Sequence, residues 1–266
     1  MNIGLALSGG GFRGIAHIGV IKALEEHNIF PDYIAGTSAG AIVGALYANG
    51  NTWEEILDFF KLTEVFSINK FALRKPGFID TEKMYDSFKN ILGIDDFSVL
   101  KKQLYITATN LVDGTLQVFH EGELIKPILA SAAFPAIFTP IKIGEAHYID
   151  GGTLNNFPVD LISGQCDKMI GVYVNPFEKK DMKDLKHSFS VLERAYRIRS
   201  AYDSLSKFKD CDMVICPNEL KKVGTFTAKD MDAIFNLGYE AAKAKLTNEN
   251  VASILQSTDS SGGREK

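Results

Sequence analysis

Short apolar runs alternate with segments of helical periodicity along most of the chain. Residues 3–7 and 33–36 are typical of buried strands, and residues 14–28 and 38–48 are typical of helices. Further strands are predicted at residues 103–112, 115–120, 140–143, 147–150, 168–175 and 213–217, and further helices at 123–134, 187–208 and 228–245. Such alternation predicts an α/β fold, with three layers forming a sandwich around a mainly parallel sheet.

The chain of 266 residues is 45% apolar, which suffices for one large core. No internal repeat or linker divides it, so a single domain is expected over residues 1–256. Residues 257–266 (STDSSGGREK) are small, polar and charged. They are expected to form a flexible tail or a cloning remnant.

Charge and cysteine content narrow the class of protein. The formal net charge is −4, which argues against a nucleic-acid partner. Cys166, Cys211 and Cys216 have no metal-ligand spacing and cannot all pair, which favours a reducing compartment and argues against structural zinc. No apolar run reaches the roughly 18 residues of a membrane span, and the start lacks the pattern of a signal peptide. A cytoplasmic protein is expected, with peripheral membrane contact left open.

A glycine-rich stretch, ALSGGGFRG, follows the first predicted strand. Gly9, Gly11 and Gly14 fit a dinucleotide loop, but no acidic residue closes the second strand, and no Gly-Lys-Ser/Thr of a P-loop follows. Bare backbone amides at a helix start bind an anionic oxygen, either of a phosphate or of a tetrahedral intermediate. Arg13 opposes the helix dipole there, which predicts a carboxylate or other anionic partner. The alternative is a tight turn without a ligand.

The stretch GTSAG, residues 36–40, lies between a predicted strand and a predicted helix. It fits the nucleophile elbow G-x-S-x-G, in which small neighbours let the chain turn sharply and expose the serine hydroxyl. Ser38 is then the nucleophile, and the N–H of Ala39 joins the oxyanion donors. The alternative is that Ser38 only caps the helix.

A serine nucleophile needs a base, and no histidine stands in a context that singles it out. His17 is expected to pack in the core, and the others are His27, His120, His147 and His187. Asp150 is a better candidate, because it ends a short strand and two glycines follow it. An ordinary Asp-Gly turn is the alternative, and Asp113 fits that interpretation more strongly.

Together these stretches resemble the patatin-like phospholipases. SGGGFRG, GTSAG, ASAAFPAIF (residues 130–138) and DGG occur in the family's order between residues 3 and about 160. Ser8 stands where plant members tend to have an acid, so the resemblance is to the bacterial type. From about residue 170 only the fold pattern is similar.

The resemblance implies a single patatin-like hydrolase domain and a Ser-Asp dyad without histidine, with Ser38 as nucleophile and Asp150 as general base. It implies an oxyanion hole formed by the amides around Gly10, Gly11 and Arg13, and no metal or cofactor. A lipid ester, of the (lyso)phospholipid or a related class, is the implied substrate. We expect Asp150 to be desolvated, since an ordinary aspartate is a poor base for an alcohol.

Three alternatives remain open. The chain could be a non-catalytic phosphate or nucleotide binder, or a triad could use His120 or His147. The third concerns the aromatic-rich segment 52–80: it could line an acyl groove as a wall or lid, or the face that contains Trp53 could pack into the core, which is the favoured interpretation.

Overall fold

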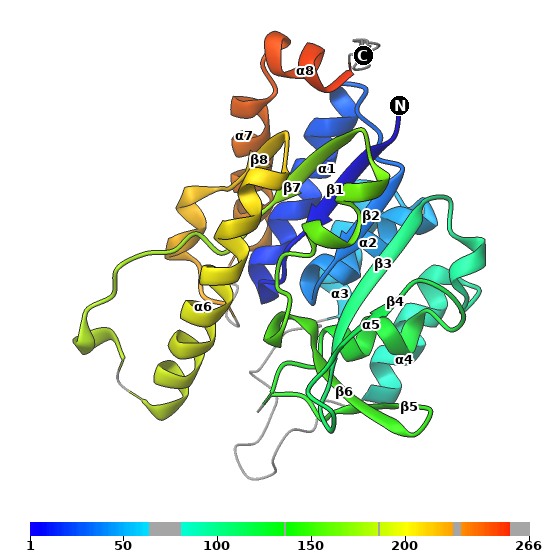
Figure 1. Cartoon of the computed structure of the whole chain (residues 1–266), viewed down its shortest axis with the longest axis vertical. Helices are drawn as coiled ribbons and strands as arrows, with labels where there is room; N and C mark the ends of the chain where they lie inside the picture. The colour runs from blue at the N-terminus through cyan, green and yellow to red at the C-terminus, as the bar shows by residue number, and fades with distance from the viewer. Residues whose placement is uncertain (64–80, 136, 186, 226–229, 256–266) are drawn as a thin grey trace, which may run out of the picture.

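The computed structural model describes residues 1–63, 81–135, 137–185, 187–225 and 230–255 (Figure 1). Within these residues a central sheet has the strand order β5-β6-β3-β2-β1-β7-β8, with β4 paired to β3. The strands are β1 (Ile3–Leu7), β2 (Tyr33–Gly36), β3 (Gln103–Asn110), β4 (Leu116–Phe119), β5 (Ile141–Ile143), β6 (Ala146–Asp150), β7 (Lys168–Val172) and β8 (Met213–Ile215).

The helices flank this sheet. They are α1 (Ile15–Glu26), α2 (Ala39–Asn49), α3 (Trp53–Thr63), α4 (Thr81–Leu92), α5 (Ile125–Ser131), α6 (Ser188–Ser206), α7 (Met231–Lys245) and α8 (Asn248–Leu255). No helix in the described part of the chain is long and apolar enough to cross a bilayer.

The centre of the sheet is parallel. Strand β1 pairs in parallel with β2 on one side and with β7 on the other, so that Leu7 lies opposite both Gly36 and Val172. The antiparallel pairs are confined to β3, β4, β5 and β6. Loops that leave the carboxyl ends of β1 and β2 therefore start side by side, at the position where open α/β sheets bind ligands.

Apolar side chains bury both faces of the sheet, as the near-continuous apolar strands predict. On β1, Leu5 and Leu7 point into the large core under the helices, and Ala6 points to the opposite face. That face is covered by a thin layer that includes Phe157 and Phe208. The predicted three-layer α/β sandwich with a mainly parallel sheet is confirmed.

Helices α1 and α7 pack closely through two glycines. A Cβ atom on Gly238 would lie 1.9 Å from the Ala16 carbonyl oxygen, and one on Gly19 would lie 2.1 Å from the Phe235 carbonyl oxygen. Only glycine permits this approach of two backbones. The last long helix is thereby fitted against the first.

The apolar face of α3 packs into the core. Ile56, Leu57 and Phe60 are buried, and the Trp53 ring stacks on Phe235 with centroids 5.3 Å apart. A capping box joins Thr52 and Glu55 through two hydrogen bonds of 3.0 and 3.3 Å. For residues 52–63 the core interpretation therefore holds. Residues 64–80 of the suggested groove wall, and the tail 257–266, lie outside the described residues.

Helix α6 is oriented in the reverse sense to an ordinary amphipathic helix, which buries its apolar face in the core. The apolar residues Leu192, Ala195, Ile198, Tyr202 and Leu205 are exposed. The opposite face carries Glu193, Tyr196, Arg197 and Ser200, which line a cavity. The sequence periodicity identified the helix, whereas the structure assigns the polar face to the interior of the protein.

Candidate active site

Ser38 lies at a strained turn between β2 and α2. Its φ of +54° and ψ of −122° fall where residues other than glycine are rare, and such strain is typical of a nucleophile elbow. A Cβ on Gly36 would lie 2.5 Å from the Gly40 carbonyl oxygen, and a Cβ on Gly40 would lie 2.3 Å from the Leu7 carbonyl oxygen. The two glycines are therefore required because the turn leaves no room for side chains.

Bonds from distant segments hold the turn in place. The Ser38 amide donates to the Ser131 hydroxyl at 2.8 Å, which gives the Ala/Ser-rich block a defined role. The buried Thr37 hydroxyl donates to the Asn155 carbonyl at 2.9 Å and lies 2.7 Å from the Thr107 hydroxyl. The Ser38 side chain makes no helix-capping bond, although the residue occupies the N-cap position. The capping interpretation of the serine is therefore wrong.

Asp150 ends β6 and is 2% exposed. Its carboxylate accepts a hydrogen bond from the Gly152 amide at 2.7 Å, and the Ser38 side chain interacts with it closely enough to affect its pKa. Its own amide donates to the Ala133 carbonyl at 2.9 Å. The first glycine of DGG is required because a Cβ on Gly151 would lie 2.3 Å from the Thr107 hydroxyl. The sequence motifs at 36–40 and 150–152 are thus brought together.

Burial dominates the electrostatics of Asp150. Desolvation raises the pKa of its carboxyl to about 7, against the opposing effects of Ser38 and of the Gly152 amide, which lower it. Tyr196 of α6 helps to bury the segment that contains Asp150, because a Cβ on Gly152 would lie 2.6 Å from the Tyr196 hydroxyl. An aspartate with this pKa is suited to accept a proton near neutral pH.

The glycine-rich loop forms a tight turn over residues Gly11–Gly14 before α1. Gly10 and Gly11 line the cavity beside Ser38. Ala39 is the first residue of α2, where backbone N–H groups have no intrahelical partner. The Arg13 amide, in contrast, donates to the Gly10 carbonyl at 3.2 Å. The Arg13 amide already donates this hydrogen bond, so it is not free to donate to an oxyanion as expected from the sequence.

The Arg13 side chain has a structural partner. Although it is 2% exposed, its guanidinium donates to the Val223 carbonyl at 2.8 and 2.5 Å, and no carboxylate pairs with it among the described ion pairs. Burial, followed by repulsion from Arg197, lowers the pKa of Arg13 to about 10. The expected anionic partner is replaced by a carbonyl from a segment 210 residues away.

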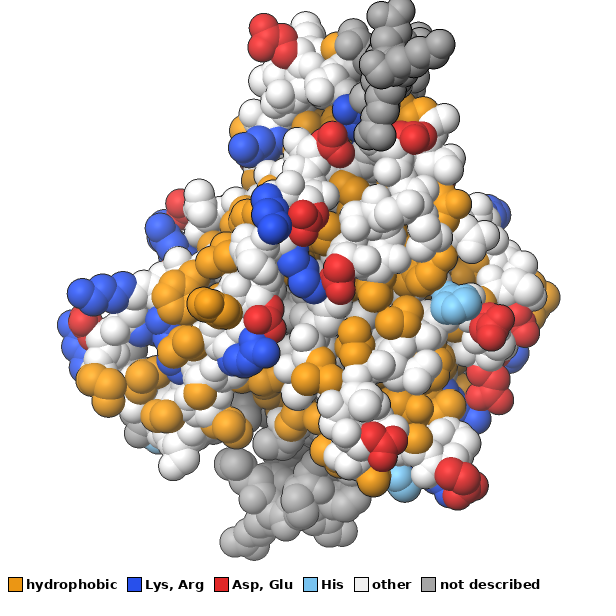
Figure 2. All heavy atoms as spheres, viewed as in Figure 1, with side chains coloured by type: hydrophobic (Ala, Val, Ile, Leu, Met, Phe, Trp, Pro, Cys, Tyr) orange, Lys and Arg blue, Asp and Glu red, His pale blue; other side chains and the backbone are white. Residues whose placement is uncertain are grey.

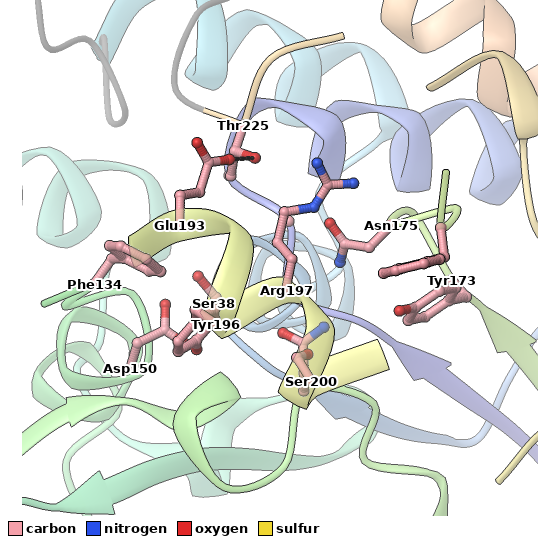
Figure 3. A pocket seen from close by; sticks show the side chains of 14 residues that line it. Ser38, Phe134, Asp150, Tyr173, Asn175, Glu193, Tyr196, Arg197, Ser200 and Thr225 are labelled. Atoms are coloured by element: carbon pink, nitrogen blue, oxygen red, sulfur yellow. Dashed lines mark hydrogen bonds between the residues drawn. The ribbon is translucent and has the colours of Figure 1, made fainter. Parts of the chain in front are cut away.

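An open cavity of about 590 Å³ joins these groups (Figure 3). Figure 3 shows that α6 contributes Glu193, Tyr196, Arg197 and Ser200 to the cavity that also contains Ser38 and Asp150. The lining residues are Gly10, Gly11, Ser38, Phe134, Asp150, Asn156, Tyr173, Asn175, Phe177, Glu193, Tyr196, Arg197, Ser200 and Thr225.

No histidine lines this cavity within the described residues. His17 is fully buried, as expected for a core residue; its Nε2 lies 2.8 Å from the Ser8 carbonyl oxygen, and desolvation lowers its pKa to about 4. His120 packs against Tyr105, and His147 is exposed on β6. The arrangement therefore gives no support to a triad with His120 or His147.

Sequence reasoning missed the residues that α6 supplies. Tyr196 and Arg197 lie more than 40 residues beyond the last motif, on a helix whose apolar periodicity drew attention to the other face. The signal that could have found them is the polar stripe of that helix. Glu193, which accepts a hydrogen bond from Thr225 at 2.6 Å, belongs to the same stripe.

Comparisons with known proteins agree with these motifs. The family model described as patatin-like phospholipase matches residues 5–163. An uncharacterised NTE family protein of Mycobacterium tuberculosis is 33% identical over 210 residues, covering 77% of this chain and 58% of that protein. Lysophospholipase NTE1 of Candida albicans is 30% identical over 224 residues, covering 79% of this chain and 16% of that protein. The chain thus spans only part of the length of these relatives.

A solved structure also shares the fold. The crystal structure of VipD from Legionella pneumophila aligns with a TM-score of 0.55 at 16% identity, covering 95% of this chain and 67% of that one. The family match includes the glycine-rich loop, the serine elbow and the DGG stretch. With more than half of its residues matched, the chain belongs to the patatin-like phospholipase family.

Proposed function

We propose that this chain hydrolyses fatty-acyl esters of lysophospholipids and phospholipids through Ser38 and Asp150. The observation that carries the proposal is a serine in a strained turn whose side chain interacts with a buried aspartate, and burial raises the pKa of that aspartate to about 7. Both line one cavity with Gly10 and Gly11. The name of the fungal relatives, lysophospholipase, supports this class of substrate.

The reaction begins when Asp150 accepts the hydroxyl proton of Ser38 and the serine oxygen attacks the ester carbonyl carbon. The amides of Gly10, Gly11 and Ala39 donate to the oxyanion that forms, each good donor contributing about 3–4 kcal/mol. Collapse of this intermediate breaks the bond to the alcohol, which leaves with the proton held by Asp150. Water then attacks the acyl-serine carbonyl carbon while Asp150 accepts a proton from it. The fatty acid is released when the bond from that carbon to the serine oxygen breaks, and Asp150 returns the proton to the Ser38 oxygen.

The wild-type protein tests this proposal directly. We expect release of fatty acid from 1-palmitoyl lysophosphatidylcholine and covalent labelling by a fluorophosphonate, because an activated serine attacks phosphorus as it attacks a carbonyl. Mass spectrometry should place the adduct on the peptide that contains Ser38. The rival function, a phosphate or nucleotide binder, predicts neither fatty acid nor adduct, and that result would refute the proposal.

A further inference from the structure

The inner face of α6 places an arginine, Arg197, in the cavity that contains Ser38. Arg197 lines this cavity together with Ser38, Asp150 and Asn175 (Figure 3). It lies beyond the family match, which ends at residue 163. The motifs that identify the family therefore say nothing about what this arginine does.

Arg197 differs from its neighbour Arg13 in how its donors are used. Arg13 gives two of its N–H groups to the Val223 carbonyl. The Nη2 atom of Arg197 is buried and has no hydrogen-bond partner within the described residues. A buried cationic donor without a partner is costly, so such a group is typical of a place where a ligand binds.

The nearest acid does not satisfy Arg197. Glu193, one turn earlier on α6, accepts its hydrogen bond from Thr225, and no ion pair between the two residues occurs in the described structure. Arg13 and Arg197 repel each other, and burial lowers the pKa of Arg197. An anion beside Arg197 would offset the repulsion between Arg13 and Arg197, and it would accept the hydrogen bond that the Nη2 of Arg197 lacks.

We propose that Arg197 binds the phosphate of the phospholipid whose ester carbonyl is attacked by Ser38. A guanidinium presents a planar fork of donors that fits phosphate oxygens, and such charge-assisted bonds are stronger than neutral ones. The cavity also holds the Tyr196 hydroxyl, a second buried polar atom for which the described residues offer no hydrogen-bond partner. This inference rests on the proposed function, because it selects phosphate-bearing esters among the substrates of that site.

The test compares a phosphate-bearing ester with a phosphate-free one. For Arg197→Leu, we expect the ratio of kcat/KM for dihexanoyl phosphatidylcholine over dihexanoylglycerol to fall about 10- to 100-fold, mainly through KM. Arg197→Lys should restore part of the ratio. Arg199→Leu is the matched control, since Arg199 is exposed on the same helix and pairs with Asp203. An unchanged ratio in Arg197→Leu would overturn the proposal, whether or not both rates fall together.

Binding separates this inference from the proposed function. Titration of Ser38→Ala with glycerophosphocholine should give a dissociation constant that Arg197→Leu weakens about 10-fold or more. If wild-type protein hydrolyses no ester yet shows this Arg197-dependent binding, the phosphate subsite stands and the hydrolase proposal fails. If the wild type hydrolyses esters but Arg197→Leu leaves the dissociation constant for glycerophosphocholine unchanged, the hydrolase proposal stands and the phosphate subsite fails.

The outer face of α6 carries an independent observation. Val191, Leu192, Ile198, Tyr202 and Leu205 are all exposed, with Tyr202 81% and Ile198 50% exposed. Phe177, 49% exposed, stacks under the Arg194 guanidinium at 4.4 Å and also lines the cavity. Figure 2 shows hydrophobic side chains gathered over α6 with Lys and Arg at the outer edge. We call this set of six residues, the five on α6 and Phe177, the α6 patch.

The charge around the α6 patch identifies what it fits. Residues 178–210 contain nine Lys and Arg against six Asp and Glu, whereas the whole chain has a net charge of −4. A helix with an apolar outer face and basic flanks lies in the interface of an anionic bilayer. Because Phe177 belongs both to the patch and to the cavity, the patch is continuous with the cavity mouth. We infer that the α6 patch docks on an anionic phospholipid surface.

Vesicle binding tests this docking surface without reference to catalysis. The wild type should sediment with phosphatidylcholine vesicles that contain about 30% phosphatidylglycerol, and less with pure phosphatidylcholine or in about 0.5 M salt. Ile198→Glu combined with Leu205→Glu should weaken binding about 10-fold or more, whereas Leu62→Glu, at an 82% exposed position on α3, should not. Absence of vesicle binding by the wild type would overturn the inference. So would a dimer in sedimentation velocity that the double variant dissociates, since the patch would then contact a second copy.

Discussion

Replacing Ser38 with alanine is expected to lower kcat/KM for acyl-ester hydrolysis by about 10⁴-fold or more, because no other group lining the described cavity can form the acyl-enzyme at the elbow. The loss should not come from unfolding. The Ser38 side chain makes no helix-capping hydrogen bond. The hydrogen bond to Ser131 is donated by the backbone amide of Ser38, so it does not involve the Ser38 hydroxyl. The free energy of unfolding should therefore change by about 1 kcal/mol or less.

The measurement is hydrolysis of a p-nitrophenyl ester and a lysophospholipid by wild type and variant, with circular dichroism and urea denaturation as checks on folding. Ser163→Ala is the matched control, since Ser163 does not line the cavity. Retained activity in Ser38→Ala would show that the nucleophile lies elsewhere.

The sequence is most informative where local sterics decide the structure. Gly36 is required by a contact within its own turn, with the Gly40 carbonyl, whereas Gly40 and Gly151 are required by contacts with the neighbouring strands at Leu7 and Thr107. The pattern of small residues marks these tight turns in the sequence. The strands and most helices follow from apolar runs and periodicity in the same way. These local patterns are enough to place Ser38 and Asp150 at strand ends.

Long-range packing decides the features that the sequence did not reveal. Asp113 and Asp150 are both followed by glycine, yet Asp113 belongs to an ordinary turn in which it accepts a bond from Asn110, whereas Asp150 is buried under another helix. Burial depends on segments far away in the chain, and so does the partner of Arg13. The orientation of α6 is a third example, because its polar face lines the cavity beside Ser38 while its apolar face is exposed.

Activity is expected to rise with pH through a midpoint near 7. Asp150 must be ionised to accept the Ser38 proton, and burial raises its pKa to about 7. Below that pH the carboxyl is protonated and the rate falls, and above it the rate reaches a plateau. The measurement is kcat/KM for an ester that does not titrate, from about pH 5 to 9. Asp150→Asn should lower kcat/KM by about 10³-fold or more and abolish this dependence. A wild-type midpoint near 4 would show that Asp150 is not the desolvated base.

The same shift predicts that Asp150→Asn stabilises the fold at alkaline pH. In an unfolded chain the Asp150 carboxyl loses its proton near the ordinary aspartate pKa of 3.8, whereas the folded protein holds it up to about pH 7. As pH rises between these values, the wild type loses free energy of unfolding, and the neutral asparagine does not. At about pH 8 the variant should be more stable by at most about 4 kcal/mol, the equivalent of roughly three pKa units. At about pH 4 the difference should nearly vanish.

Urea denaturation of both proteins at about pH 4 and about pH 8 measures this difference, and other titrating groups cancel in the comparison. An asparagine at position 150 can still accept the hydrogen bond from the Gly152 amide, and its own amide group can donate a hydrogen bond to Ser38. The substitution therefore changes the charge of the site more than its packing. A variant less stable than the wild type at the higher pH would mean that the folded protein favours the carboxylate, with a pKa below 3.8. In that case burial would not raise the pKa of Asp150, and it could not be the reason why this carboxylate accepts the Ser38 proton. A stabilised but inactive variant would instead show that this family member gives up stability in order to keep an ionisable carboxyl beside its serine.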